Sequence, residues 1–261
     1  MSRSTIWLLR TSVPLAAITV LAEIVYPLVG GQARDAVTVV TVLVFFAASI
    51  SHAGLTRGGR PAAALVVVAV GGGLLAEAIG IRTGWPFGRY DYTGGLGPSL
   101  AGVPAVIPLA WAMMAWPAYL VGARLTRTWP RPRAARVVLA GWALASWDLF
   151  LDPQMVAAGH WRWQHPAPGL PGVPGVPLSN YLGWVAISLG LMALLDAVVR
   201  DPGEGADAVP LGLYLWTYGS SVLAHAAFFG LAGSAAWGAV GMGLVALPLA
   251  RSLRRPVEVR T

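Results

Sequence analysis

The sequence predicts an all-α, polytopic helical membrane protein that crosses the bilayer about eight times. Hydrophobic residues make up 56% of the 261 residues, and charged residues only 11%. The mean hydropathy is +0.65. The apolar residues also fall into runs of about 20, the length that a helix needs to cross a bilayer. This composition lies outside the range of soluble domains and indicates a membrane-embedded bundle.

Eight apolar segments account for most of the chain, and no loop between them is long enough to form a soluble domain. We therefore expect one integral-membrane domain over residues 1–261. The last segment is the weakest, because it is rich in glycine and ends at Pro248, so seven spans are an alternative. The expected spans are approximately 12–30, 36–54, 61–81, 104–123, 135–152, 178–199, 209–229 and 233–250.

The arginines predict how these spans are oriented. All 18 basic residues are arginine. With the N-terminus inside, only four of them fall on the outer side (Arg34, Arg82, Arg89 and Arg162) and the remaining 14 fall on the inner side. Positive residues accumulate in the cytoplasmic segments of membrane proteins. We therefore expect a multi-pass protein of the cell membrane with both termini in the cytoplasm, and the basic charge does not indicate nucleic-acid binding.

The composition excludes several chemistries. Without cysteine the chain has no disulfide, no catalytic thiolate and no cysteine-ligated metal. Without lysine it has no amine for a retinal Schiff base. The four histidines lack the HxxxH or HxxH spacing of a di-iron site, and no glycine-rich stretch has the context of a nucleotide site. We expect no metal and no cofactor.

The stretch Glu77–Pro98, EAIGIRTGWPFGRYDYTGGLGP, concentrates polar and aromatic residues at one end of a span. A carboxylate at membrane depth costs about 2.5–3.5 kcal/mol on insertion scales, which makes Glu77 a candidate functional residue. A structural counter-ion to Arg82 or Arg89 is the alternative. The aromatic residues are suited to a large, flat, apolar ligand, or else form an aromatic belt. Asp91 is expected to organise the loop by accepting hydrogen bonds from backbone amides.

Asp148 and Asp152 form a second candidate group. Their i, i+4 spacing places both carboxyl groups on one helix face, and Pro153 is expected to end the helix and leave Asp152 at its mouth. Two like charges in a poorly solvated site do not both ionise easily, so one should hold a proton near neutral pH and serve as a proton donor. A helix-end pair bonded to Arg162 or to loop amides is the alternative.

The predicted orientation brings ionisable groups from separate spans to the outer leaflet. His225, one of this set, is expected to make an interhelical hydrogen bond rather than to catalyse. His52 and Asp196 fall at the inner ends, where we expect satisfied interfacial roles. The groups at the outer leaflet are Glu23, Glu77, Asp148, Asp152 and His225.

Three blocks in the middle of the chain carry a resemblance to a known family. In combination they resemble the integral-membrane carotenoid hydratases of the CruF and bisanhydrobacterioruberin hydratase type. The blocks cover a little under half of the chain, and the first and last spans show only generic hydrophobicity. They are EAIGIRTGWPFGRYDYTGGLGPSLAGVPAVIPLAWAMM (77–114), WDLFLDPQMVAAGHWRW (147–163) and GVPLSNYLGW (175–184).

The resemblance implies that water is added to the terminal double bond of an acyclic, ψ-end carotenoid, giving a tertiary 1-hydroxyl group. A carboxylic acid would donate the proton, aromatic faces would hold the carbocation and a second carboxylate would deprotonate the attacking water. The candidate catalytic residues Glu77, Asp148 and Asp152 suit this chemistry. The implied substrate-binding residues are Trp85, Phe87, Arg89, Tyr90, Tyr92, Trp147, Trp161, Trp163, Asn180 and Trp184.

The expected partners are the acyclic carotenoid substrate and membrane lipid, together with other carotenoid enzymes, and not nucleic acid. Two other functions stay open at this point. A carotenoid cyclase or elongase would share the protonation step and end the cation differently. A carrier for lipid or pigment would perform no reaction. Product mass distinguishes them, because hydration adds one water molecule, cyclisation adds nothing and a carrier leaves the pigment unchanged.

The orientation predicts the outcome of reporter fusions. Fusions after Arg133 and after Arg255 should both report a cytoplasmic location, because arginine-rich segments stay inside. A fusion after Tyr92 should not. An external signal from the fusion after Arg133 would contradict the orientation.

Overall fold

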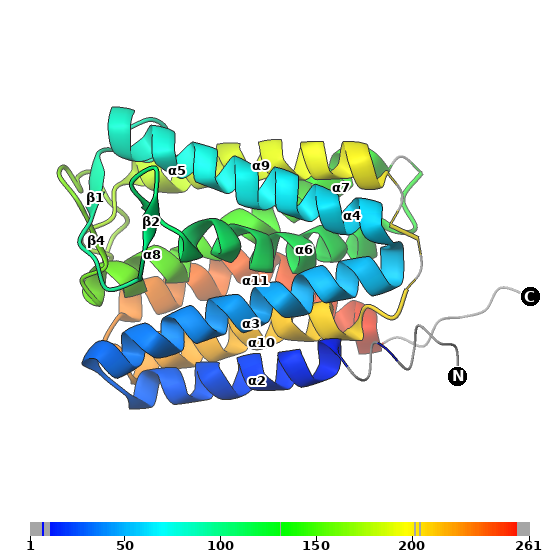
Figure 1. Cartoon of the computed structure of the whole chain (residues 1–261), viewed down its shortest axis with the longest axis horizontal. Helices are drawn as coiled ribbons and strands as arrows, with labels where there is room; N and C mark the ends of the chain where they lie inside the picture. The colour runs from blue at the N-terminus through cyan, green and yellow to red at the C-terminus, as the bar shows by residue number, and fades with distance from the viewer. Residues whose placement is uncertain (1–6, 8–10, 131, 201, 204, 255–261) are drawn as a thin grey trace, which may run out of the picture.

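The computed structural model describes residues 7, 11–130, 132–200, 202–203 and 205–254, and within them the chain is a bundle of helices running along one axis (Figure 1). The predicted all-α fold class is confirmed. The helical segments are α2 (Ser12–Val25) with the short η1 (Tyr26–Leu28), α3 (Gly31–Arg57), α4 (Gly59–Ala64) continued by η2 (Leu65–Gly71) and α5 (Gly72–Thr83), α6 (Val106–Thr126), α7 (Pro132–Ala145), α8 (Asp148–Ala157), α9 (Leu178–Val199), α10 (Ala208–Ala227) and α11 (Ala232–Arg254).

Each predicted span coincides with helix in the structure. Among the described residues, six continuous helical stretches are long and apolar enough to cross a membrane. The glycine-rich last span, α11, is one of them, so the doubt about it was misplaced. The two remaining predicted spans correspond to α2 with η1, a shorter apolar helix, and to α10. The chain is therefore a polytopic membrane protein.

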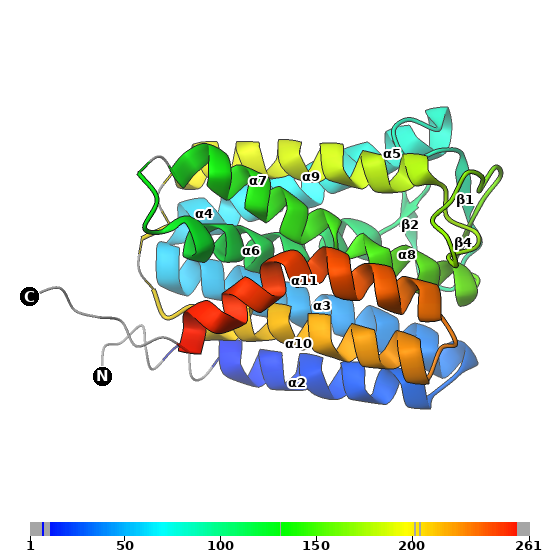
Figure 2. The same ribbon diagram turned by 180° about the vertical axis from the view of Figure 1, so that it is seen from behind.

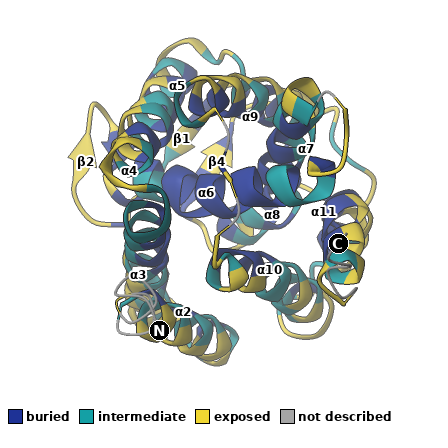
Figure 3. Ribbon diagram, turned by 90° about the vertical axis from the view of Figure 1, so that its right-hand side faces the viewer, coloured by how far each residue is buried: buried dark blue, intermediate teal, exposed yellow. Residues whose placement is uncertain are grey.

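Helix α6 lies at the centre of the bundle, and the other helices surround it (Figure 3). In its most apolar stretch, 83% of the residues are buried. A helix that is apolar on all faces, as α6 is from Val106 to Val121, belongs in the interior rather than against solvent or lipid. The view from behind shows α7, α9 and α11 on the opposite side of α6 from α3 (Figure 2).

The two ends of the bundle differ in charge. Helix α2 begins and α11 ends at the same end of the bundle (Figure 1). That end also carries the described arginines assigned to the inner side, whereas Arg34, Arg82, Arg89 and Arg162 belong to segments at the other end. Arg3, Arg10, Arg131, Arg255 and Arg260 lie outside the described residues.

Pro117 and Pro153 lie inside helices, and the carbonyl that each one frees accepts a hydrogen bond from a serine of a neighbouring helix. A proline inside a helix leaves the carbonyl four residues earlier without its helical partner. Pro117 frees the carbonyl of Met113, which accepts a hydrogen bond from the hydroxyl of Ser49 at 2.7 Å. The same relation recurs in α8.

Pro153 does not end its helix, so that prediction was wrong: α8 begins at Asp148 and continues to Ala157. The carbonyl that Pro153 frees belongs to Leu149, and the hydroxyl of Ser234 in α11 donates to it at 2.6 Å. The helix therefore passes through the proline without losing a backbone partner. Asp148 and Asp152 both remain on one helix, at i, i+4.

The two long loops at the carboxyl-rich end pair with each other. Strand β1 (Tyr90–Tyr92) runs antiparallel to β4 (Trp161–Trp163), with Tyr90 opposite Trp163 and Tyr92 opposite Trp161. Successive side chains of a strand point to opposite faces. The tryptophans of β4 are buried and Arg162 between them is exposed. The two-stranded ribbon formed by β1 and β4 therefore turns one aromatic face toward the bundle. Strands β2 (Ser99–Leu100) and β3 (Val103–Pro104) form a second short pair nearby.

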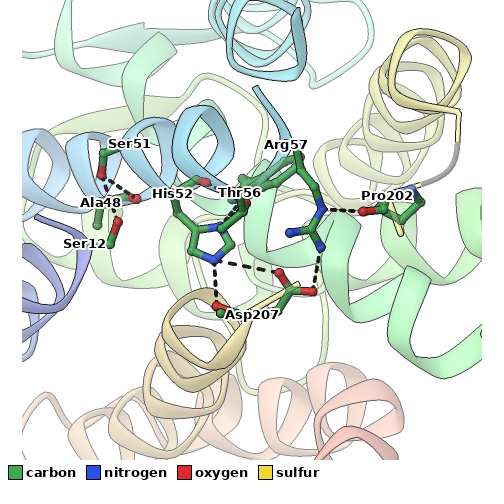
Figure 4. A network of polar contacts seen from close by, with 10 residues as sticks. Ser12, Ala48, Ser51, His52, Thr56, Arg57, Pro202 and Asp207 are labelled. Carbon is green, nitrogen blue, oxygen red and sulfur yellow. Dashed lines mark hydrogen bonds and ion pairs between the residues drawn. The ribbon is translucent and has the colours of Figure 1, made fainter. Parts of the chain in front are cut away.

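Polar groups at the opposite end pair with one another. The Nε2 of His52 donates to the carbonyl of Ala206 at 3.1 Å, its Nδ1 accepts from the indole of Trp116 at 3.0 Å, and Arg57 pairs with Asp207 at 2.8 Å (Figure 4). Asp196 likewise accepts from two arginines and a tyrosine, Arg133, Arg136 and Tyr119. The structural role expected for His52 and Asp196 is confirmed.

Candidate functional site

Glu77 lies in α5, is buried, and accepts hydrogen bonds from three side chains. The hydroxyls of Tyr90 and Tyr92 donate to its Oε2, the latter at 2.9 Å, and the indole of Trp111 donates to its Oε1 at 2.9 Å. No ion pair joins Glu77 to an arginine among the described contacts, and Arg82 instead donates to the carbonyls of Ala78 and Ala101. The alternative of a counter-ion role for Glu77 was therefore wrong.

The donors around Glu77 keep their protons. Burial and the neighbouring Glu77 raise the pKa of the Tyr90 hydroxyl, and the same two causes raise the pKa of Tyr92. Both phenols therefore remain hydrogen-bond donors at any physiological pH. The arrangement surrounds one carboxylate with three neutral donors.

Two glycines on the Glu77 face of the helix make room for these donors. Gly73 and Gly80 are four residues before and three residues after Glu77, so all three share one side of the helix. A Cβ at Gly73 would lie 2.8 Å from the ring of Trp111, and one at Gly80 would lie 3.2 Å from the hydroxyl of Tyr90. Small residues at these positions therefore let Trp111 and Tyr90 reach the carboxylate.

Asp148 and Asp152 are buried together in α8 and share one amide, an arrangement that we call the aspartate pair. The side-chain nitrogen of Asn180, near the start of α9, donates to an oxygen of each, at 2.7 Å for Asp148. The indole of Trp161 donates to the second oxygen of Asp152 at 3.0 Å. The two carboxyl groups also contact each other.

The aspartate pair has no cationic partner among the described residues, and Oδ1 of Asp148 has no hydrogen-bond partner there. Arg162, which we had considered as a partner, lies on the exposed face of β4. The alternative of a helix-end pair bonded to Arg162 or to loop amides was therefore wrong. The donors are instead an asparagine and a tryptophan.

Glu77 and Asp152 line a cavity inside the bundle. Most of its wall is aromatic or aliphatic, with residues from α3, α6, α8 and α9. Asp148 lies behind Asp152 and is not part of this wall. The cavity extends as far as Glu23 on α2 and hydroxyl side chains on α3 and α10. A mainly apolar cavity with a few polar groups is the usual form of a site for an apolar ligand.

The aromatic side chains of the wall are packed against one another. The rings of Trp111 and Trp184 stack with their centroids 3.9 Å apart, and Trp147 meets Trp184 edge-on at 6.1 Å. Between β1 and β4, the ring centroids of Tyr90 and Trp163 are 5.3 Å apart, and those of Tyr92 and Trp161 are 5.7 Å apart. Rings held in this way present fixed faces to the cavity.

The structure brings most of the predicted substrate-binding residues to the cavity. Trp85 and Arg89 are the exceptions and correct the prediction. Trp85 is 64% exposed in the turn after α5, and Arg89 is exposed in the bend just before β1. The residues that do line the wall are Phe87, Tyr90, Tyr92, Trp147, Trp161, Trp163, Asn180 and Trp184.

Asp91 also faces outward, and its carboxylate accepts from the side chain of Gln164 at 3.1 Å. The prediction that backbone amides would bind Asp91 was therefore wrong, since a side chain across the ribbon supplies the donor. The same alternation that buries Tyr90 and Tyr92 exposes Asp91.

Trp111 and Gln154 are polar residues of the site that were not predicted from the sequence. Trp111 supplies a hydrogen bond to Glu77, and the signal for it was present, since a buried indole needs an acceptor. Gln154 lines the cavity beside Asp152, and its Oε1 lies 3.1 Å from Nε2 of His225. The other nitrogen of His225 bonds Ser234 at 2.8 Å, so His225 makes the interhelical contacts expected of it.

Among the described residues, no group of three or more histidine, aspartate or glutamate side chains lies close enough together to hold a metal ion.

Fold and site together define a polytopic helical membrane protein with an aromatic-walled cavity and buried carboxyl groups at one end. The sequence matches the carotenoid biosynthesis protein family over residues 37–249, so this chain belongs to that family.

A curated relative is the bisanhydrobacterioruberin hydratase of Haloarcula japonica, 31% identical over 141 residues. The match covers 54% of this chain and 45% of that protein, so the chain spans less than half the length of this relative. No solved structure matches the chain.

Proposed function

We propose that this protein hydrates the terminal double bond of an acyclic carotenoid in the cell membrane and forms a tertiary 1-hydroxyl group. Family membership supports a role in carotenoid biosynthesis. The name of the Haloarcula japonica relative supports hydration as the reaction. The cavity supports an apolar substrate, because its wall is mainly aromatic and aliphatic.

The aspartate pair is the observation that carries the proposal. Two carboxylates without a cation in a buried site repel each other and lose their hydration, so binding one proton between them is favourable. The single amide of Asn180 bridges the two groups and cannot neutralise their charge. A carboxylic acid in a dry site beside an apolar cavity is the proton donor that an unactivated alkene requires.

The first step transfers this proton to the substrate. Asp152 lines the cavity and Asp148 does not, so Asp152 delivers the proton and Asp148 shares it. The π electrons of the terminal double bond form the new C–H bond at the carbon that bears a hydrogen. The positive charge then resides on the neighbouring carbon, which carries the two methyl groups, as a tertiary carbocation.

Glu77 and the aromatic wall stabilise the carbocation. Glu77 is held by three donors, so it serves as a fixed negative charge rather than as a base that must move. The faces of Trp111 and Trp184 present additional electron density to a cation. Water then forms the C–O bond, and the proton that it loses returns to the aspartate pair. The aspartate pair therefore regains the proton that it gave to the alkene, and no external acid is consumed.

The product formed in a carotenoid-producing host tests this proposal. Expression in bacteria that accumulate lycopene should yield pigments heavier than lycopene by one or two water molecules, identified by mass spectrometry. A new pigment of unchanged mass would indicate cyclisation, and unaltered lycopene in the presence of folded protein would indicate a carrier. Either result contradicts hydration.

Isosteric substitutions should separate catalytic from structural roles. Asp152→Asn, Asp148→Asn and Glu77→Gln keep the size of the side chain but remove the carboxyl group, so product formed per folded molecule should fall about 10²–10⁴-fold. Asp91→Asn is the matched control, because Asp91 lies at the same end on the exposed face, and it should retain the parent rate.

Folded protein must be measured in the same membranes, for instance by size-exclusion chromatography in detergent. If a carboxyl group had only a structural role, its substitution would reduce the amount of folded protein while the surviving molecules stayed active. If all three cavity variants are well folded and convert substrate at nearly the parent rate, the carboxyl mechanism is wrong.

A further inference from the structure

Two threonines that line the cavity have hydroxyl groups without a hydrogen-bond partner among the described residues. They are Thr41 in α3 and Thr217 in α10, and Thr217 is only 5% exposed. A threonine in a helix usually donates to the carbonyl four residues earlier. The other buried threonines of the bundle follow that rule: Thr19 donates to Leu15, Thr38 to Arg34 and Thr126 to Gly122. Thr41 and Thr217 depart from it.

These two threonines belong to a polar region of the cavity that is formed by α2, α3 and α10, whereas the aspartate pair lies on α8. The carboxyl group of Glu23 faces the side chains of Ser220 and Trp216 across the contact between α2 and α10. Ser220 itself donates weakly to the carbonyl of Thr217, at 3.4 Å. We call this region the polar wall, and define it as Glu23, Thr41, Thr217, Ser220 and Ser221, all of which line the cavity.

We propose that the polar wall binds the water molecule that adds to the substrate, an inference that rests on the proposed function. A buried hydroxyl without a partner is unfavourable, and in native proteins its partner is commonly a ligand or an ordered water. An acyclic hydrocarbon has no group that can hydrogen-bond to Thr41 or Thr217. Water is the one reactant of a hydration that can.

The carboxyl end of the cavity is poorly suited to this task. Three donors already occupy Glu77, and two occupy Asp152. A buried water is stably held where it finds two to four polar partners. The polar wall offers a carboxyl group and several hydroxyls within one continuous cavity, and most of the remaining wall is apolar.

Water supply determines the fate of the carbocation. In one outcome water forms the C–O bond and gives up a proton to the aspartate pair, which yields the alcohol. In the other, a neighbouring C–H bond breaks, its electron pair re-forms an alkene, and the proton returns to the aspartate pair. The second outcome exchanges hydrogen with the acid without adding water. The ratio of alcohol to exchanged alkene therefore reports how well water is held.

The test measures this ratio in membranes suspended in deuterated buffer, with an acyclic carotenoid as substrate. Thr41→Val and Thr217→Val keep the shape of the side chain and remove the hydroxyl. Each should lower the ratio of alcohol to deuterium-containing alkene by about five- to tenfold, the effect of losing one typical hydrogen bond to water. The double variant should lower it further, and mass spectrometry quantifies both products.

Two control variants distinguish water binding from packing. Thr126→Val removes a buried threonine hydroxyl outside the cavity and should leave the ratio unchanged. Thr217→Ser keeps the hydroxyl and should retain the parent ratio. If the ratio of alcohol to exchanged alkene falls in Thr217→Ser as it does in Thr217→Val, packing rather than water binding is responsible, and the proposal is overturned.

The outcomes also separate this proposal from the proposed function. If the parent protein forms alcohol and the valine variants keep its ratio of alcohol to exchanged alkene, only the water-binding role is contradicted. A parent protein that forms no alcohol contradicts the hydration and, with it, the role of the polar wall.

Discussion

A pair of buried aspartates bridged by one asparagine amide sets the main constraint on this structure. Carboxyl groups at membrane depth are costly unless they are hydrogen-bonded. Here the donors are neutral: an amide from α9 and an indole from β4 for the aspartate pair, and two phenols and an indole for Glu77. Arginine would have neutralised the carboxyl groups and removed their capacity to deliver a proton.

This choice of donors explains the unusual loops. Tyr90 and Tyr92 come from β1 and Trp161 from β4, so the ribbon formed by these strands supplies three of the five side chains that donate to the three carboxyl groups. The ribbon also closes the cavity with the rings of Trp161 and Trp163. The same segment therefore satisfies the buried carboxyl groups and contributes part of an aromatic wall for an apolar substrate.

Much of this arrangement was predictable from the sequence, because it follows from run length and spacing. Apolar runs of about 20 residues predicted the helices, and the i, i+4 spacing predicted that Asp148 and Asp152 share a face. The period of two in YDY and WRW carries the information that Tyr90 and Trp161 point inward, and applying it would have removed Arg89 from the predicted substrate-binding residues.

Other features depend on contacts between distant residues and were not predictable. Pro153 reads as a helix end until Ser234, 81 positions later, is known to satisfy the carbonyl that the proline frees. Glu23 was predicted to lie in the same leaflet as the other carboxyl groups, but its position on the same cavity as Thr41 and Thr217 arises only when α2, α3 and α10 pack. Such long-range partners decide what a buried polar residue does.

The central claim is that the aspartate pair holds one proton at neutral pH, and infrared spectroscopy of the carbonyl stretch of protonated carboxyl groups tests it most directly. Purified protein in lipid should show this band at neutral pH, and the band should shift on transfer to deuterated buffer. The account predicts that the band persists in Glu77→Gln and is lost when Asp148 and Asp152 are both changed to asparagine. A folded parent protein without the band, or a band that survives in the double variant, would contradict the account.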